Sequence, residues 1–194
     1  MYLAIEGIDT AGKSTQIARL RERFRDAVFT KEPGGTKTGE RIRSLLLETG
    51  VASERAELLL FLADRSEHVA EIVVPNRNRL IVSDRSAVSG IAYAMAAERF
   101  SPDELLRLNR FATGGIFPDV VVILKLDEAE LSRRLAMKTP DAIEMRGTDY
   151  LLQIQARLET AAGLLELPTV VIDAALPPEH ITDAIADLIE KGDT

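Results

Sequence analysis

The chain has 194 residues, a length that predicts one domain over residues 1–194, and its 28% charged and 46% hydrophobic residues are typical of a soluble globular protein. It has no cysteine, which excludes disulfides and thiolate metal sites, and no apolar run of about 20 residues, which argues against a membrane span. The net charge of −7 argues against a nucleic-acid surface, which is normally basic, but still allows a small anionic ligand. We therefore expect a cytoplasmic protein with no signal peptide, no membrane association and no nucleic-acid partner.

Five short apolar runs predict β-strands over residues 2–6, 27–31, 80–84, 120–126 and 169–173. Valine and isoleucine are frequent in the last three runs, and none of the five alternates cleanly with polar residues. This composition is typical of strands that are covered on both faces.

Segments of helical period separate these strands. Ile17, Leu20 and Phe24 share one face of the first, and apolar residues at 181, 185, 188 and 189 mark a final amphipathic helix. The string "SPDE" at 101–104 predicts a helix start, with a serine N-cap and a glutamate three residues later. Alternating strands and helices predict an α/β fold with a five-stranded parallel sheet and helices on both faces. The polar stretch 136–148 interrupts this pattern and predicts a mobile excursion between two helices.

The string "GIDTAGKS" fits the spacing G-x-x-x-x-G-K-S/T of a phosphate-binding loop, between a predicted strand and a predicted helix. Its glycines let backbone N–H groups turn towards phosphate oxygens. We expect Lys13 to bridge the β- and γ-phosphates of a nucleotide and Ser14 to bind Mg²⁺. The alternative is an ordinary glycine-rich turn with Lys13 in solvent. The expected phosphate-binding residues are Gly7, Ile8, Asp9, Thr10, Ala11, Gly12, Lys13, Ser14 and Thr15.

Two further strings follow predicted strands, "KEPGGT" at 31–36 and "SDRS" at 83–86. Because the carboxyl ends of parallel strands meet at one edge of a sheet, we expect both to lie beside the phosphate loop, where ligands of open α/β sheets bind. Asp84 is then placed to bind a metal-bound water, and Arg85 to hold a phosphate with two N–H groups. The alternative for Asp84 and Arg85 is a local ion pair that ends the strand.

The helical segment "LLLFLADRSEHV" at 58–69 places Phe61 and Arg65 four residues apart, on one face. A flat apolar ring beside a guanidinium could hold a planar base and its acceptor edge. A core phenylalanine beside a surface arginine is the alternative, and periodicity alone favours it.

Together these strings resemble the thymidylate kinase family, the P-loop nucleoside monophosphate kinases that convert dTMP to dTDP with ATP and Mg²⁺. The resemblance covers nearly the whole chain, through "EGIDTAGKSTQ", "TKEPGGT", "LLFLADRSEHV", "SDRSAVSGIAY", "FATGGIFPDVVVILKLD" and "IDA". The strings "EPGGT" and "ATGGIFPD" are more specific than the phosphate loop, and no guanine-binding N-K-x-D motif is present.

The resemblance implies that Asp9, an acid inside an anion-binding loop, accepts a hydrogen bond from the 3′-hydroxyl of dTMP. The alternative is that Asp9 only braces the loop through backbone N–H groups.

Other site residues are implied by the positions that they occupy in the family. Phe61 would stack on thymine, Arg65 would bind a base carbonyl, and Pro33 would pack near the methyl group. Arg85 would hold the dTMP phosphate, and Asp84 would help to position Mg²⁺. The remaining implied contacts are Tyr93 and Ser89 at the sugar, and the chain at Asp173 and Ala174 at the adenine.

The chain departs from the common family pattern at several positions. Lys31 and Ser86 stand where many members have arginine and tyrosine. The stretch 136–148 corresponds to the short lid of the family, and there Ala142 replaces an arginine. Thr10 does not supply the arginine that some members carry in the phosphate loop. Lys138 and Arg146 are candidates for the missing cation; the alternative is that both are solvated lid charges. The candidate catalytic residues are therefore Lys13, Arg85 and Arg146.

The implied reaction is Mg²⁺-dependent transfer of the ATP γ-phosphoryl group to dTMP, by an enzyme that is typically a homodimer in this family. The residues themselves leave two alternatives open: another nucleoside or nucleotide kinase, or a nucleotide-dependent switch protein.

Overall fold

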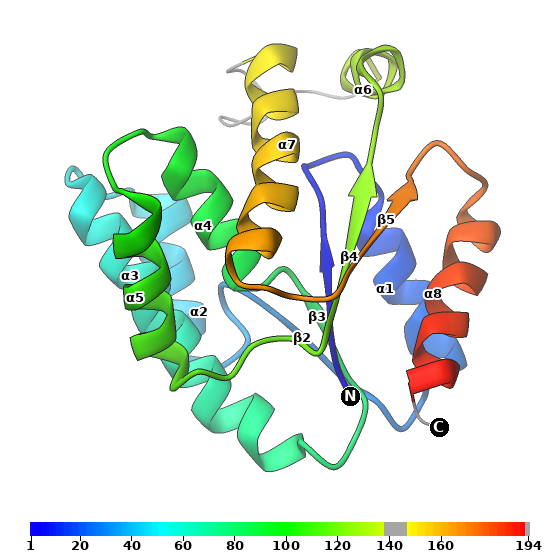
Figure 1. Cartoon of the computed structure of the whole chain (residues 1–194), viewed down its shortest axis with the longest axis horizontal. Coiled ribbons are helices and arrows are strands. Elements are labelled where there is room, and N and C mark those ends of the chain that lie inside the picture. The colour runs from blue at the N-terminus through cyan, green and yellow to red at the C-terminus, as the bar shows by residue number, and fades with distance from the viewer. Residues whose placement is uncertain (138–146, 193–194) are drawn as a thin grey trace.

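The computed structural model describes residues 1–137 and 147–192, and contains a five-stranded sheet surrounded by helices (Figure 1). All paired strands run parallel, in the order β2-β3-β1-β4-β5, which confirms the predicted fold class. The strands are β1 (Tyr2–Glu6), β2 (Val28–Lys31), β3 (Ile81–Asp84), β4 (Val120–Lys125) and β5 (Thr169–Asp173). β2, β3 and β4 are each one residue shorter than predicted.

The helices are α1 (Lys13–Arg23), α2 (Lys37–Ser44), α3 (Glu54–His68), α4 (Ala87–Ala96), α5 (Pro102–Thr113), α6 (Glu128–Leu135), α7 (Thr148–Leu164) and α8 (Pro178–Gly192). Short π-helical turns at Leu45–Thr49 and Val69–Val73 extend α2 and α3, and a 3-10 turn follows at Val74–Asn76. The predicted start of α5 is confirmed: Ser101 caps the helix, and Glu104 completes a capping box with it.

Alternate residues of β4 divide the core between the two faces of the sheet. Val122 and Leu124 pack in a cluster with residues of α1 and α8, whereas Val121 and Ile123 pack with residues of α4 and α7. In Figure 1, α1 and α8 lie on one side of the strands, and α4 lies on the other. The strands β1, β3 and β4 are largely buried, as predicted, but the edge strands β2 and β5 are partly exposed.

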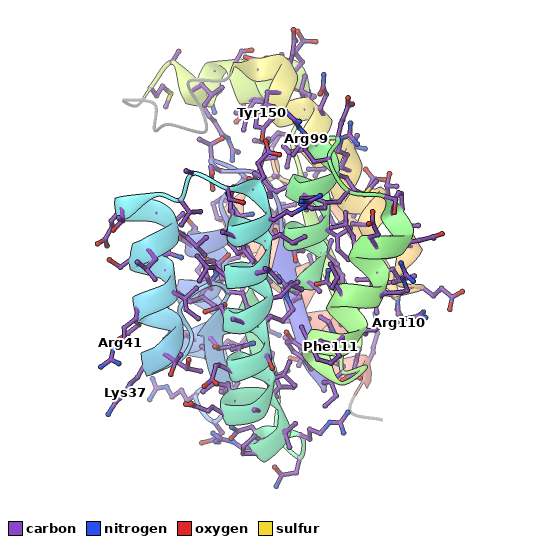
Figure 2. The ribbon with its side chains drawn as sticks, turned by 90° about the vertical axis from the view of Figure 1, so that its left-hand side faces the viewer. Lys37, Arg41, Arg99, Arg110, Phe111 and Tyr150 are labelled. Atoms are coloured by element: carbon purple, nitrogen blue, oxygen red, sulfur yellow. The ribbon has the colours of Figure 1, made fainter. Side chains whose placement is uncertain are left out.

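An outer layer of helices contains α2, α3 and α5, and Figure 2 looks onto it. Leu58 and Leu62 of α3 and Leu105 of α5 point inwards and are buried. Two large apolar side chains of the same helices do not: Leu59 of α3 is 60% exposed and Phe111 of α5 is 88% exposed. The outer face of this layer is therefore partly apolar.

The parallel sheet brings the carboxyl ends of all five strands to one edge. The phosphate loop follows β1 at the centre of the sheet, the segment with Arg85 follows β3 beside it, and the "EPGG" segment follows β2. Most of the predicted lid, residues 138–146, lies outside the described residues. Among the helices that the structure describes, none has the length and apolar character needed to cross a membrane.

Candidate active site

The phosphate loop needs glycine at both ends of its motif. Gly7 has φ 152°, and a Cβ atom there would lie 2.9 Å from the carbonyl oxygen of Leu124. Gly12 is the N-cap of α1 and has φ 92°. This left-handed conformation is one that glycine adopts without strain. Thr10 takes a similar left-handed conformation, φ 70°, despite its β-branched side chain. The loop therefore has the sharp, inward-turned backbone that the spacing predicts.

The first turn of α1 is open to an anion. No side chain caps the helix, and there is no acidic residue in its first turn. The unpaired backbone N–H groups and the positive end of the helix dipole both favour a phosphate at this position. Ser14 and Thr15 are exposed there, while Lys13 is only 7% exposed and its Nζ donates to the carbonyl oxygens of Gly7 and Ile8, at 2.9 and 3.0 Å.

The ammonium group of Lys13 is easily neutralised in this position. Burial, followed by the nearby charge of Arg85, lowers the pKa of Lys13 to about 8, although Asp9 and Asp84 act in the opposite direction. Asp9 Oδ1 lies 3.9 Å from Lys13 Nζ. A bound triphosphate would favour the charged form of this lysine.

Arg85 joins the phosphate loop to α4. Its Nη2 donates to Asp9 Oδ1 at 2.8 Å, and its Nη1 donates to Ser89 Oγ at 3.0 Å and to the carbonyl oxygen of Gly7 at 3.3 Å. The Arg85 guanidinium also lies over the ring of Tyr93, with its Cζ 5.7 Å from the ring centre. The structure thus brings together four of the residues predicted to bind the acceptor nucleotide.

Asp9 keeps part of its acceptor capacity. The bond from Arg85 uses Asp9 Oδ1, and no described residue donates to Asp9 Oδ2. The hydroxyl of Tyr93 is buried and has no hydrogen-bond partner within residues 1–137 and 147–192. Burial raises the pKa of Tyr93 to about 12, despite the nearby Arg85 charge, so the phenol remains neutral and able to donate.

Glu6, which the sequence reading did not single out, holds the start of α4. It is fully buried at the end of β1, and it accepts hydrogen bonds from the hydroxyls of Ser86 and Ser89 and from the Ser89 N–H. Burial raises the pKa of Glu6, and the two serine hydroxyls act in the opposite direction. An acid directly before the first glycine of the motif was the signal available in the sequence.

Asp84 suits a role near a metal ion. Its Oδ1 is buried and accepts no hydrogen bond from the part of the chain that the structure describes, which leaves an acceptor available at the edge of the sheet. Among the described residues, no group of three or more His, Cys, Asp or Glu side chains could hold a metal ion by itself. Two oxygen ligands, one from Asp84 and one from the exposed Ser14, would suit Mg²⁺, which usually takes one or two protein ligands and completes its shell with phosphates and water.

Of the predicted base-binding residues, Arg65 lies beside the segment with Arg85, because its Nη2 donates to the carbonyl oxygen of Ser86 at 3.4 Å. Phe61 is half-buried and belongs to none of the three hydrophobic clusters, so part of its ring is free for a ligand. Pro33 is buried. Arg65 is 3% exposed, and its surroundings include Glu32, His68 and Asn109, which the sequence reading did not assign.

Arg134, at the end of α6, was another omission. Its Nη1 donates to the carbonyl oxygen of Thr10 at 2.9 Å, and its Nη2 donates to that of Ala174 at 2.7 Å. It therefore ties the phosphate loop to the segment after β5, where adenine contacts were expected. Ala174 is buried, and Asp173 is exposed, with its Oδ1 accepting the N–H of Ala175. The lid candidates Lys138, Ala142 and Arg146 lie outside the described residues.

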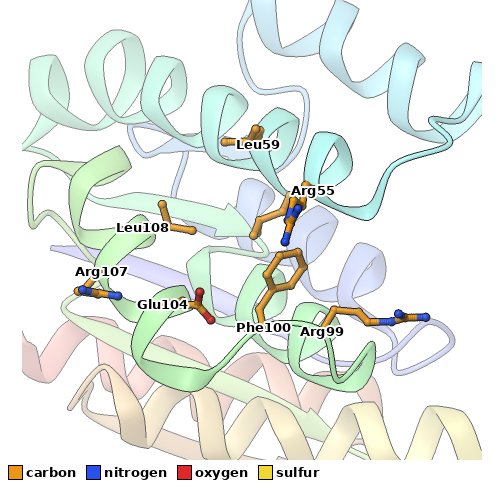
Figure 3. Close-up of a pocket in the computed structure, with 8 residues that line it drawn as sticks. Arg55, Leu59, Arg99, Phe100, Glu104, Arg107 and Leu108 are labelled. Carbon is orange, nitrogen blue, oxygen red and sulfur yellow. The ribbon is translucent and has the colours of Figure 1, made fainter.

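A groove between α3 and α5 is separate from this site (Figure 3). It is lined by Arg55, Leu58, Leu59, Arg99, Phe100, Glu104, Arg107 and Leu108. None of the predicted phosphate-binding or base-binding residues belongs to it.

An anion-binding loop with Asp9, Arg85, Ser89 and Tyr93 gathered beside it, at the carboxyl edge of a parallel sheet, fits the class of P-loop phosphotransferases. A family model described as thymidylate kinase matches residues 5–185, and the chain belongs to the thymidylate kinase family.

Curated relatives with the same family name match nearly the whole chain. The chain is 53% identical to the thymidylate kinase of Sulfurimonas denitrificans over 189 residues, which cover 97% of this chain and 99% of the relative. It is 52% identical to that of Wolinella succinogenes over 181 residues, covering 93% and 94%, and 48% identical to that of Aliarcobacter butzleri over 189 residues, covering 97% and 98%.

Proposed function

We propose that the chain transfers the γ-phosphoryl group of ATP to dTMP, giving ADP and dTDP, with Mg²⁺ at the phosphates. Membership of the thymidylate kinase family makes the chain an enzyme that phosphorylates dTMP from a nucleotide donor. ATP as the donor, Mg²⁺, and the role of each residue are the parts that we add.

The observation that carries these roles is the Arg85 bridge. A single guanidinium, at the end of β3, contacts both the phosphate loop, through Asp9, and α4, through Ser89. We assign it to the 5′-phosphate of dTMP, which would sit between the donor site and the base site. Asp9 would then accept the sugar hydroxyl through Oδ2, and Tyr93 would pack against the same sugar.

On the donor side, Lys13 and the N–H groups from Gly7 to Thr15 would hold the ATP phosphates. Ser14 and Asp84 would hold Mg²⁺, which supplies charge neutralisation between the phosphates when it is bound. The segment at Asp173 and Ala174 would approach the adenine, kept in place by Arg134.

This chemistry needs no general base. The second pKa of a phosphate monoester is about 6, so the acceptor oxygen of dTMP is already ionised at neutral pH. The work of the protein is to align the two phosphates and to place positive charge around the group in transfer. Lys13 and Arg85 are the described cations for this task, and Arg146 is the candidate in the lid.

We also propose that the protein is a homodimer, as the family resemblance implies, with a second copy covering the α3–α5 face. Support comes from Leu59 and Phe111, whose large apolar side chains are 60% and 88% exposed there. The groove of Figure 3 runs along the same pair of helices.

The direct test is to incubate the protein with ATP, Mg²⁺ and dTMP and to separate the nucleotides by ion-exchange chromatography. We expect dTDP and ADP in equal amounts, and no dTDP when Mg²⁺ is chelated. Hydrolysis of ATP without dTDP formation would contradict the proposal and would favour a nucleotide-dependent switch.

A further inference from the structure

Arg65 is held from three other parts of the fold. Its Nε donates to Glu32 Oε2 at 2.8 Å, its Nη1 donates to Asn109 Oδ1 at 2.6 Å, and its Nη2 donates to the carbonyl oxygen of Ser86 at 3.4 Å. A guanidinium carries five N–H groups, so these bonds leave one N–H on each terminal nitrogen for a ligand. The orientation of that remaining pair is set by the three partners.

The Glu32 partner is itself fixed. Its Oε1 lies 2.9 Å from His68 Nδ1, and His68 Nε2 lies 2.8 Å from Thr30 Oγ1. Burial raises the pKa of Glu32, but Arg65 and His68 outweigh burial and leave it below its ordinary value. Glu32 is therefore the charged partner that keeps Arg65 in the interior.

The Asn109 partner adds direction without charge. It is fully buried on α5, and its Nδ2 donates to the carbonyl oxygen of Leu105 at 2.8 Å, one helical turn earlier. With the Nδ2 occupied in this way, the Oδ1 faces Arg65 and can only accept. Rotation of the guanidinium would break this bond and leave a buried acceptor unpaired.

Gly90 makes room for the arrangement from α4. A Cβ atom at this position would lie 2.6 Å from Arg65 Nη2 and 3.1 Å from Nη1. Any larger residue would push the guanidinium away from its present place.

We propose that Asn109 is a positioning residue, which aims the remaining N–H groups of Arg65 at the base and so selects pyrimidines with a carbonyl at position 4 over those with an amino group. The inference rests on the proposed function, since it concerns the acceptor base of that reaction. A 4-carbonyl accepts from Arg65, whereas a 4-amino group presents a second donor to a buried donor. A site of this kind discriminates strongly, because the mismatched pair leaves buried polar groups without partners.

The test compares kcat/KM for dTMP and for dCMP in four variants. Asn109→Leu removes the acceptor at similar size, and we expect the dTMP/dCMP ratio to fall about tenfold or more, with the KM for ATP unchanged. Asn109→Asp keeps an acceptor for Nη1 but loses the bond to the Leu105 carbonyl oxygen. It should hold the ratio within about threefold of the parent, since a charge-assisted bond to Nη1 is at least as strong. Thr113→Val is the control for α5, because it removes the bond from Thr113 Oγ1 to the Asn109 carbonyl oxygen and the bond from the Gly115 N–H to Thr113 Oγ1, but leaves the Asn109 side chain in place. Its ratio should not change.

Gly90→Ala keeps the test decisive if Asn109→Leu does not fold. Alanine favours a helix interior, so α4 should remain stable while Arg65 is displaced, and the ratio should fall as well. An unchanged ratio in a folded, active Asn109→Leu or Gly90→Ala enzyme would overturn the inference and leave Asn109 a purely structural residue. If the unmodified enzyme makes no dTDP, the proposed function fails instead.

Discussion

At the scale of single residues, Asp9 shows how an acid can belong in a loop that binds anions. One carboxylate oxygen is bonded to Arg85 at 2.8 Å, and the side chain lies 3.9 Å from Lys13 Nζ, so its charge is compensated by two cations. The second oxygen has no donor among the described residues. The loop can therefore hold phosphate on one side and a hydroxyl of the acceptor on the other.

We predict that Asp9→Asn raises the KM for dTMP by about 10- to 100-fold, because a hydrogen bond to a charged group is typically worth about 1.5–3 kcal/mol. The KM for ATP should hardly change. Steady-state kinetics with each substrate varied in turn will measure both, with the exposed α1 residue Glu22, changed to Gln, as the matched control. A rise in the KM for ATP alone would show that Asp9 braces the phosphate loop instead.

The lowered pKa of Lys13 predicts a pH dependence. In the free enzyme Lys13 loses its proton through pH about 8, so kcat/KM for ATP should be highest below that pH and fall as the pH rises. Saturating ATP should move the fall to higher pH, because the bound triphosphate favours the charged lysine. A pH–rate profile on Lys13→Arg is the control, since arginine keeps its proton and should lack this falling limb. A parent profile that stays flat up to pH about 10 would contradict the assignment.

The lowered pKa of Lys13 also makes the free energy of unfolding depend on pH. Between about pH 8 and the ordinary lysine pKa of 10.5, the unfolded chain binds a proton at Lys13 that the native state has released. The contribution of this group to the free energy of unfolding therefore increases with pH in that window, and below it the buried charge lowers stability.

At the scale of elements, helix α5 combines a feature that the sequence predicts with one that it hides. The capping box at Ser101 and Glu104 depends on neighbouring residues, so the string "SPDE" suffices to predict it. The bond from Arg65 to Asn109 joins residues 44 positions apart and depends on how α5 packs beside α3. Helical periodicity does not predict contacts between residues so far apart in the chain, which is why Asn109 was not among the predicted site residues.

We predict that Ser101→Ala lowers the free energy of unfolding by about 1 kcal/mol, the usual cost of losing a helix N-cap, without changing turnover. Urea unfolding followed by circular dichroism, beside an activity assay, will measure both. Ser101→Thr, which keeps the capping oxygen, should lose much less stability. Equal losses in the two variants would mean that the cap contributes nothing.

Arg134 and Glu32 show the same limit of sequence reading. Arg134 has the spacing of a solvent-facing helical residue, and only the fold reveals that α6 ends beside the phosphate loop. The "EPGG" string indicated a turn at the site, but the partners of the Glu32 carboxylate come from α3, which lies about 30 residues further along the chain.

At the scale of the whole molecule, the sheet order determines how much of the site could be predicted. Any parallel sheet brings the loops after β1, β2 and β3 to one edge, so the neighbourhood of the phosphate loop, Arg85 and "EPGG" followed from the sequence. The individual bonds of Arg85 to Asp9 and Ser89 depend on side-chain packing and did not follow.

The exposed apolar residues of α3 and α5 belong to the same scale. We predict that Leu59→Asp converts the proposed homodimer to a monomer, because a charge at this position would be buried without a partner in an interface. Light scattering coupled to size-exclusion chromatography will give the molar mass. Leu59→Met, which keeps the apolar contact, is the control. A parent protein that is monomeric at micromolar concentration would contradict the proposed homodimer.

The account as a whole depends on dTMP being the preferred acceptor. The most direct test measures kcat/KM, with saturating ATP and Mg²⁺, for dTMP, dUMP, ribose TMP and AMP in the parent enzyme and in Lys13→Ala. We expect dTMP to be used best by the parent, and Lys13→Ala to lose at least about a hundredfold in turnover with a normal melting temperature, as is typical when a charge-stabilising group is removed. A parent enzyme that prefers AMP, or a Lys13→Ala variant that transfers phosphate at the parent rate, would contradict the account.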